Sequence, residues 1–214
     1  MRSPFAERER ERLIEAILPD VPFDGWTRRA LRHAARRLDI PESEALALFP
    51  RGAPDLIAEF SHWADRRMLE RLATAAAEPA GLSRLVAMAL RLRFEVMLPW
   101  REGVRRGLSV LALPQNVPLG LRLLYDTVDA VWHGVGDHPT DFSFYTKRAT
   151  LAGVAAAATL YWLDDRSPNF AETQAFIERR LADLHRLSGL RQRLAGAADM
   201  LPNPLRLRRP TAQQ

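Results

Sequence analysis

The chain has 214 residues, no cysteine, and 31 Lys and Arg against 26 Asp and Glu, which gives a net charge of +5. This length predicts one domain, or one domain with a small appendage, that needs no disulfide or metal to hold a core. A sequence without cysteine excludes a disulfide scaffold, Cys-ligated zinc or iron–sulfur sites and thiol catalysis. The basic balance favours an anionic partner, either nucleic acid or a membrane surface, and does not choose between them.

Proline and glycine divide the chain into helical segments, and no segment alternates apolar and polar residues over the length of a strand. We therefore predict an all-α fold of about nine to ten helices. The expected helices cover residues 5–18, 27–38, 41–49, 55–77, 81–98, 99–113, 118–133, 141–163 and 170–187. Residues 22–25 and 134–139 are expected to be loops. The helix over 141–163 is apolar enough that we expect it to be buried on most sides.

The first part of the chain has the spacing of a helix-turn-helix, with a turn at 39–41 and a short helix that ends before Pro50. This pattern resembles the DNA-binding head of TetR-type transcription regulators. The expected recognition segment contains Glu42 and Glu44 and no basic residue, so DNA phosphates would repel it, and we do not expect DNA as a partner. The preceding helix is basic and leaves a weak contact with a phosphate backbone open. Its arginines are Arg28, Arg29, Arg32, Arg36 and Arg37.

The five histidines form no catalytic or metal-binding pattern. There is no His-Glu-x-x-His, and Glu59 with His62 gives a single Glu-x-x-His, whereas a di-iron bundle needs two of these and two further glutamates. A Gly-x-Ser-x-Gly motif is absent, and Gly134-Val135-Gly136 is too short for a phosphate-binding loop. We therefore predict no enzyme activity, no metal site and no cofactor.

The most specific segment covers residues 136–151 and reads Gly-Asp-His-Pro-Thr-Asp-Phe-Ser-Phe-Tyr-Thr-Lys-Arg-Ala-Thr-Leu. Asp164-Asp165-Arg166-Ser167 follows it, and then a stretch from Thr173 to Leu181. With the acidic short helix, these segments resemble the coenzyme Q biosynthesis accessory family over nearly the whole chain. The resemblance implies a TetR-like fold, lipid binding, and support of demethoxyubiquinone hydroxylase, a di-iron enzyme of ubiquinone synthesis.

The resemblance also implies a partner-binding patch for the hydroxylase at the end of the helix over 118–133 and the start of the helix over 141–163. On this chain the patch maps to Asp129, Val131, Trp132, Phe144 and Tyr145. We add Arg148, whose charge can pair with Asp137, Asp141 or the acids of a partner. Aromatic anchors dominate interface energetics, which suits such a patch. The alternative is that the aromatic side chains seal the intervening loop against the core.

The larger helical part of a TetR-like fold often holds a ligand cavity, and an isoprenoid quinone or a phospholipid suits an apolar one. Candidate lining residues are the inward apolar residues of the long helices. These are Leu85, Met88, Leu92, Val96, Leu123, Leu124, Val154 and Leu160. The same residues at helical spacing also describe an ordinary packed core, so the sequence leaves both alternatives open.

The tail, residues 188–214, combines an apolar arc with arginines, as an interfacial helix on anionic lipid does. Candidate membrane contacts are Leu187, Leu190, Arg191, Arg193, Leu194 and Leu201. The alternative is a helix that packs back on its own domain. We accordingly divide the chain into a helix-turn-helix-like unit (1–65), a helical lipid-binding body (66–187) and this basic tail.

No stretch approaches 18 uncharged apolar residues, and residues 1–12 mix arginine with acids, so we expect neither a membrane span nor a targeting peptide. The resulting prediction is a non-enzymatic cytoplasmic protein, peripheral on the inner face of a bacterial inner membrane, that presents a quinone intermediate to the hydroxylase. The apolar helix surface would also support a homodimer. The competing predictions are a ligand-responsive transcription regulator and a structural adaptor with a filled core.

Overall fold

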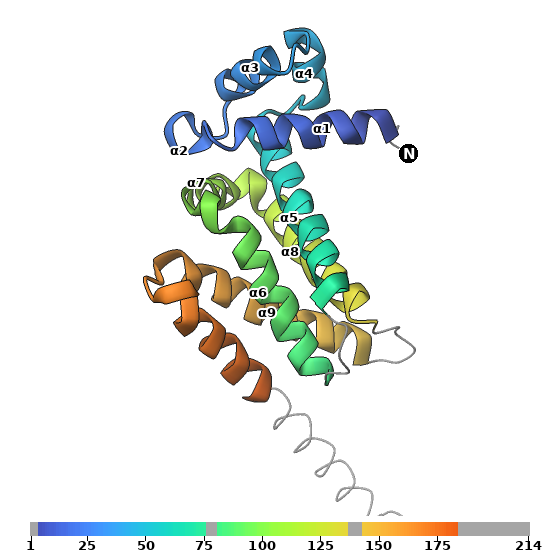
Figure 1. Cartoon of the computed structure of the whole chain (residues 1–214), viewed down its shortest axis with the longest axis vertical. Coiled ribbons are helices and arrows are strands. Elements are labelled where there is room, and N and C mark those ends of the chain that lie inside the picture. The colour runs from blue at the N-terminus through green and yellow to red at the C-terminus, as the bar shows by residue number, and fades with distance from the viewer. Residues whose placement is uncertain (1–3, 76–80, 137–142, 184–214) are drawn as a thin grey trace, which may run out of the picture.

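The computed structural model describes residues 4–75, 81–136 and 143–183, and in this part of the chain all regular structure is helical. Figure 1 shows an N-terminal head at one end and a larger helical body below it. The α-helices are α1 (Pro4–Ile17), α2 (Val21–Asp24), α3 (Arg28–Arg37), α4 (Glu42–Leu48), α5 (Ala53–Ala75), α6 (Leu82–Met97), α7 (Arg101–Leu111), α8 (Val117–Gly134) and α9 (Ser143–Asp164). Residues 171–183 form a further helix, and three short 3-10 helices are η1 (Leu98–Trp100), η2 (Pro114–Asn116) and η3 (Pro168–Phe170). The predicted all-α fold is confirmed.

The head consists of α1 to α4. Thr27 caps α3, because its hydroxyl oxygen accepts a hydrogen bond from the Ala30 amide at 3.2 Å. The buried side of α3 is built largely of alanines, so α3 lies close to α1. Residues 22–25, predicted as a loop, instead include most of α2. Pro22 fits in the first turn of a helix, and Gly25 ends it at a φ of 69°, where glycine is favoured.

The body is held together by α5, which packs along both α6 and α8 and leads from the head into the body (Figure 1). The predicted boundary between residues 65 and 66 lies inside this unbroken helix. Aromatic side chains fill the centre of the body, where Phe94 stacks on Trp162 at 5.2 Å between ring centroids. The same helix, α5, therefore contributes to the core of the head and to the core of the body.

The helix over 141–163 was expected to be buried on most sides, and α9 leaves one side exposed. Leu151, Ala158 and Trp162 are buried, but Leu160 and Tyr161 are exposed. Gly153, Ala157 and Tyr161 are exposed and four residues apart, so they lie on one side of the helix and form an outward strip with Leu160. An apolar strip that the body does not cover lies beside the cavity described next.

Candidate functional site

A cavity of about 490 Å³ lies among α5, α6, α7, α8 and α9. Its wall is mainly apolar, and three aromatic rings, those of Trp26, Phe60 and Phe94, contribute to it. Small residues of α7, α8 and α9 and of the turn after α7 also contribute to the wall. These are Gly103, Gly107, Ala112, Gly120, Ala155 and Ala156. The Trp26 indole donates a hydrogen bond to the Gly103 carbonyl oxygen at 2.8 Å and so fixes α7 at one end of the cavity.

The cavity reaches the surface between α8 and α9. Leu121 and Leu160 both line it, yet they are 64% and 63% exposed. Val117, at the start of α8, also lines the cavity and is exposed. These three residues, which we call the mouth, offer an apolar entrance rather than a polar one. Exposed apolar side chains that gather at one place indicate a contact with lipid, ligand or another protein.

One polar cluster interrupts the apolar wall. Arg93 of α6 donates from Nε to Oδ1 of Asp65 on α5 at 2.7 Å, and from Nη2 to the Ser61 hydroxyl at 3.1 Å. The Thr127 hydroxyl of α8 donates to the other Asp65 oxygen at 3.1 Å. Arg93, Ser61 and Thr127 line the cavity, and the Arg93 and Asp65 side chains are only 12% and 8% exposed. The cluster therefore joins three helices at the cavity wall.

The structure separates the eight predicted cavity residues into two groups. Leu123, Leu124 and Leu160 line the cavity. Val96 and Val154 are buried in the core, whereas Leu85, Met88 and Leu92 are half-buried, and none of these five lines this cavity. On α6 the wall is formed instead by Leu90, Arg93, Phe94 and Met97. Periodicity could not choose the correct side of α6, because this helix is apolar around most of its circumference.

Sequence reasoning missed the polar cluster, although a signal for it exists. Asp65 lies between the buried residues Phe60 and Met68 on the inward side of α5. Arg93 lies between Leu90 and Met97 on the inward side of α6. A charge at an inward helical position is rare unless it is paired, so each of these residues predicts a buried partner. The sequence does not say which residue that partner is.

The predicted partner patch lies at the C-terminal end of α8 and the N-terminal end of α9. Val131 is fully buried and Trp132 is 8% exposed, so both pack into the core. Asp129 is half-buried and accepts hydrogen bonds from buried Arg148 at 3.0 Å (Nε) and 2.6 Å (Nη2). This pair joins α8 to α9. The side chains of Phe144 and Tyr145 lie outside the described residues.

The predicted membrane contacts in the tail, residues 187–201, lie outside the described residues as well. Among the helices that the structure describes, none is both long and apolar enough to cross a membrane. The described residues also hold no group of three His, Asp or Glu side chains arranged for a metal ion.

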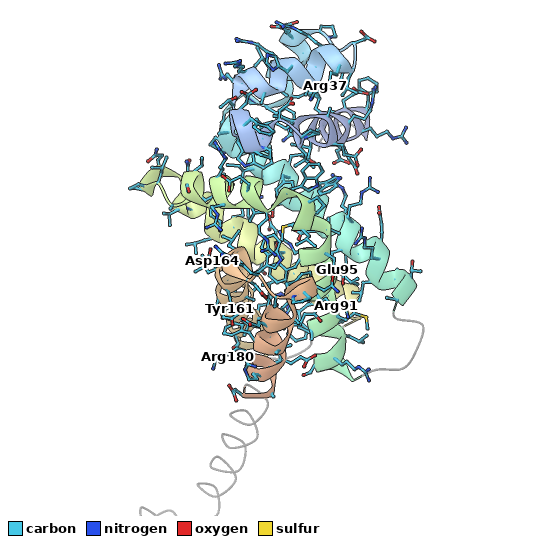
Figure 2. All side chains as sticks on the ribbon, turned by 60° about the vertical axis from the view of Figure 1, so that its left-hand side comes forward. Arg37, Arg91, Glu95, Tyr161, Asp164 and Arg180 are labelled. Carbon is cyan, nitrogen blue, oxygen red and sulfur yellow. The ribbon has the colours of Figure 1, made fainter. Side chains whose placement is uncertain are left out.

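The arginines of α3 are largely engaged within the head. Arg36 donates to Oε1 of Glu42 at 2.9 Å (Nε) and 2.6 Å (Nη2), and Arg32 lies 3.6 Å from the other Glu42 oxygen. Arg37, labelled at the head in Figure 2, donates to Asp20 at 2.7 Å and to the Ala16 carbonyl. The first acid of the expected recognition segment therefore pairs with Arg32 and Arg36 of the basic helix beside it, which weakens the attraction of these two arginines to phosphates.

Beyond α9, Asp165 organises the start of the helix over 171–183. Its carboxylate accepts from the Ser167 amide and hydroxyl at 2.8 and 2.6 Å, and from the Thr173 amide and hydroxyl at 2.8 and 2.5 Å. Burial raises the pKa of Asp165, but these hydrogen bonds outweigh it and lower the pKa to about 2. The carboxylate thus holds the turn after α9 in a fixed conformation.

Comparison with known proteins places the chain in one family. A sequence model of the COQ9 family matches residues 117–188. The mitochondrial ubiquinone biosynthesis protein COQ9 of Rattus norvegicus is 35% identical over 184 residues, which cover 83% of this chain and 59% of the relative. The COQ9-B protein of Xenopus laevis is 30% identical over 202 residues, which cover 90% of this chain and 68% of the relative. The human protein is 34% identical, and 58% of its length is covered, so this chain spans about three fifths of the mammalian relatives.

Among solved structures, a TetR transcriptional regulator from Nitrosomonas europaea ATCC 19718 has the same fold. The TM-score is 0.65 over 82% of this chain and 97% of that chain, at 19% sequence identity. At this identity the likeness concerns the fold alone, and it confirms the predicted TetR-like architecture.

Proposed function

Because the chain belongs to the COQ9 family, we propose that it is a non-enzymatic, lipid-binding accessory protein of ubiquinone biosynthesis. In this proposal it takes a hydrophobic quinone intermediate from the membrane into the cavity. It then presents the intermediate to the demethoxyubiquinone hydroxylase. Each of these steps uses a different part of the body, and the helix-turn-helix head takes no part in DNA binding.

The single observation that supports the proposal most strongly is the apolar cavity of about 490 Å³. Ligand pockets in proteins commonly have about 300–1,000 Å³, an apolar wall and a few placed polar groups. A prenylated quinone is mostly hydrocarbon with a small polar ring, so its two parts match the apolar wall and the Asp65–Arg93 cluster. A phospholipid would match the wall as well and is the alternative ligand.

The mouth supports an exchange of ligand with a membrane. Leu121, Leu160 and Val117 are exposed at the entrance, where a hydrocarbon tail would pass from lipid into the cavity without crossing a polar rim. The basic tail, residues 188–214, would add an attraction to anionic lipid. We propose peripheral binding, on the inner face of the inner membrane if the source is a bacterium. The relatives that carry the COQ9 name are described as mitochondrial.

We assign the transfer of the quinone to the hydroxylase to the patch around Asp129 and Tyr145, as the resemblance implies. Asp129 is partly exposed beside α9, where an acid would orient a partner. Val131 and Trp132 are buried, so they would pack beneath the surface of the patch and position it, rather than contact the hydroxylase directly.

The ligand step is tested by filling the cavity. Ala156 lines the cavity, whereas its neighbour Ala157 is exposed, so Ala156→Phe and Ala157→Phe form a matched pair on one helix. Each protein is mixed with vesicles loaded with ubiquinone, separated by flotation, and assayed for quinone in the protein fraction. We expect the wild type and Ala157→Phe to remove quinone from the vesicles and Ala156→Phe to remove much less. Equal removal by both variants would contradict a role of this cavity.

The partner step is tested with Tyr145→Ala, and Tyr161→Ala serves as its control. Tyr161 is an exposed tyrosine of the same helix, on the lower part of the molecule in Figure 2. The two positions are 16 residues apart, or about 24 Å along a helix. We expect only Tyr145→Ala to lose binding to the purified hydroxylase in a pull-down experiment, while both variants keep their bound lipid. Unchanged binding by Tyr145→Ala would contradict the assigned patch.

A further inference from the structure

We propose that the Asp65–Arg93 pair, together with Ser61, recognises the polar end of the ligand through an uncharged oxygen acceptor such as a quinone carbonyl or a methoxy group. This inference rests on the proposed function, because it assigns the polar end of the same ligand. It adds a specificity site to a cavity whose wall is otherwise apolar.

Hydrogen-bond capacity at the cavity wall is the first argument. A guanidinium has five N–H groups. Among the described residues, Arg93 uses one toward Asp65, one toward Ser61 and one toward the Met97 sulfur at 3.2 Å. One N–H on each terminal nitrogen is therefore left over. Ser61 accepts from Arg93, and its own O–H is given to no acceptor in the described part of the chain. The cluster thus offers the remaining N–H groups of Arg93 and the O–H of Ser61 as donors, while the positive charge of Arg93 is already paired with Asp65.

Charge balance decides which kind of ligand group suits these donors. Asp65 lies 2.7 Å from Arg93 and neutralises it, and the Asp65 carboxylate is further held by Thr127. An additional anion, such as a phosphate, would meet the field of Asp65 as well as that of Arg93. A neutral carbonyl or ether oxygen accepts a hydrogen bond from a charged donor without this repulsion, and such bonds are stronger than those between neutral groups.

The cost of burying the pair is the second argument. An ion pair inside a protein loses solvation, and a well-packed apolar pair of similar volume is often as stable or more stable. α6 carries apolar residues at its neighbouring inward positions, Leu90, Phe94 and Met97, so an apolar residue at position 93 would continue the wall. An arginine at this position fits better with recognition of a ligand than with the cohesion of α5 and α6.

The position of the cluster along α8 predicts how the ligand is oriented in the cavity. Val117 and Leu121 of the mouth and Thr127 of the cluster all line the cavity, and six residues separate Leu121 from Thr127. Six residues of α-helix span about 9 Å. The polar ring would therefore lie inside the cavity, and the prenyl tail would extend toward the mouth. Thr127 is two residues from Asp129, so the ring would be held at the end of the cavity nearest the proposed partner patch.

A displacement assay on the full chain tests the inference. The uncharged fluorophore N-phenyl-1-naphthylamine is displaced by decylubiquinone, by decylbenzene, which lacks oxygen, or by dodecyl phosphate, which carries an anionic head. The key variant replaces the whole pair, with Asp65→Leu and Arg93→Met, so that no buried charge is left alone. The control variant replaces the other buried pair on α5, with Glu59→Leu and Arg10→Met, which does not line the cavity. Thermal unfolding checks that each variant is folded.

For the wild type and the control variant we expect decylubiquinone to bind about tenfold or more tightly than decylbenzene, as one hydrogen bond to a charged group would give. In the Asp65→Leu/Arg93→Met variant this ratio should fall at least tenfold. Differences in size between the two probes cancel, because the same ratio is compared across variants. Dodecyl phosphate should bind the wild type more weakly than decylubiquinone.

Three other results are distinguishable. An unchanged ratio in the Asp65→Leu/Arg93→Met variant would overturn the inference while leaving the proposed function intact, since both probes would still occupy the cavity. A preference for dodecyl phosphate would overturn the choice of an uncharged acceptor. If none of the probes displaced the fluorophore from the wild type, the proposed function itself would fail, and the inference with it.

Discussion

Glu59 and Asp65 are both buried on the same helix, and each binds an arginine at 2.7 Å, but the two pairs have different surroundings. Glu59 binds Arg10 of α1, whose guanidinium lies over the Phe49 ring at 4.4 Å and also donates to the Leu48 carbonyl. That pair fills a joint among α1, α4 and α5. Asp65 binds Arg93, which lines a cavity. The same type of ion pair is therefore packed between helices in the head and borders a cavity in the body.

This difference indicates that the functional site lies in the body rather than in the head. In the head, Glu42 pairs with Arg32 and Arg36, and Asp20 pairs with Arg37, so three arginines of α3 have acidic partners within the chain. In the body, Ala155 and Ala156 line space that the large side chains do not fill. The fold shared with a transcription regulator therefore does not define the function, and the candidate site is the cavity in the body.

The largest expected effect comes from breaking each pair on one side. Among the described residues, Arg93→Met leaves buried Asp65 with the Thr127 hydroxyl as its one side-chain partner, so it should lower the free energy of unfolding by about 3–5 kcal/mol. Arg10→Met should cost less, because Glu59 keeps Arg66 at 3.3 Å. Urea unfolding of the two variants measures the difference. If Arg10→Met lowered the free energy of unfolding more than Arg93→Met, this would contradict the expectation that Glu59 keeps a better remaining partner than Asp65 does.

A smaller effect is expected at Asp165, which lies apart from both pairs. Its pKa is about 2 in the folded chain against a usual 3.8, so the stabilisation is complete above about pH 4 and is lost as the pH falls toward 2. Asp165→Ala should cost about 1–3 kcal/mol near neutral pH, because it leaves the buried Thr173 groups without an acceptor. Thermal unfolding from pH 7 to pH 2 should show the wild type and the variant converging. A constant difference over this range would contradict the assigned hydrogen bonds.

The smallest effect on stability is expected at exposed apolar residues, where head and body can be compared directly. Leu121→Ser at the mouth and Phe23→Ser in the head both change an exposed side chain, so each should alter the free energy of unfolding by no more than about 0.5 kcal/mol. Sedimentation with anionic vesicles should distinguish them, since only Leu121→Ser removes a contact with lipid. Equal binding by both variants would show that the mouth does not face the membrane.

Much of the fold could be predicted, because its signals are local. Thr27 provides a cap, Pro41 and Pro50 limit a short helix, and the alanines of α3 mark a buried side. α2 was missed because four residues are too few for a helical period to appear. These successes and this failure depend on the same fact, that a pattern must span about two turns before it predicts a helix.

The site was harder to predict, because it depends on contacts between distant segments. The family resemblance implies Asp129 as part of the patch, and we add Arg148. The structure brings these two residues together across α8 and α9. The cavity depends instead on which side of α6 faces inward, and an apolar helix does not reveal this. The pairing of Asp65 with Arg93 joins residues 28 positions apart, so no motif in the sequence announces it.

Native mass spectrometry of the purified protein, followed by organic extraction of any bound molecule, tests whether the cavity holds a ligand. We expect a mass above that of the bare chain and an extract that contains an isoprenoid quinone or a phospholipid. The Ala156→Phe variant should carry much less of it. A wild-type chain that remains at its sequence mass, also after incubation with ubiquinone-loaded vesicles, would contradict the claim that the cavity is a ligand site.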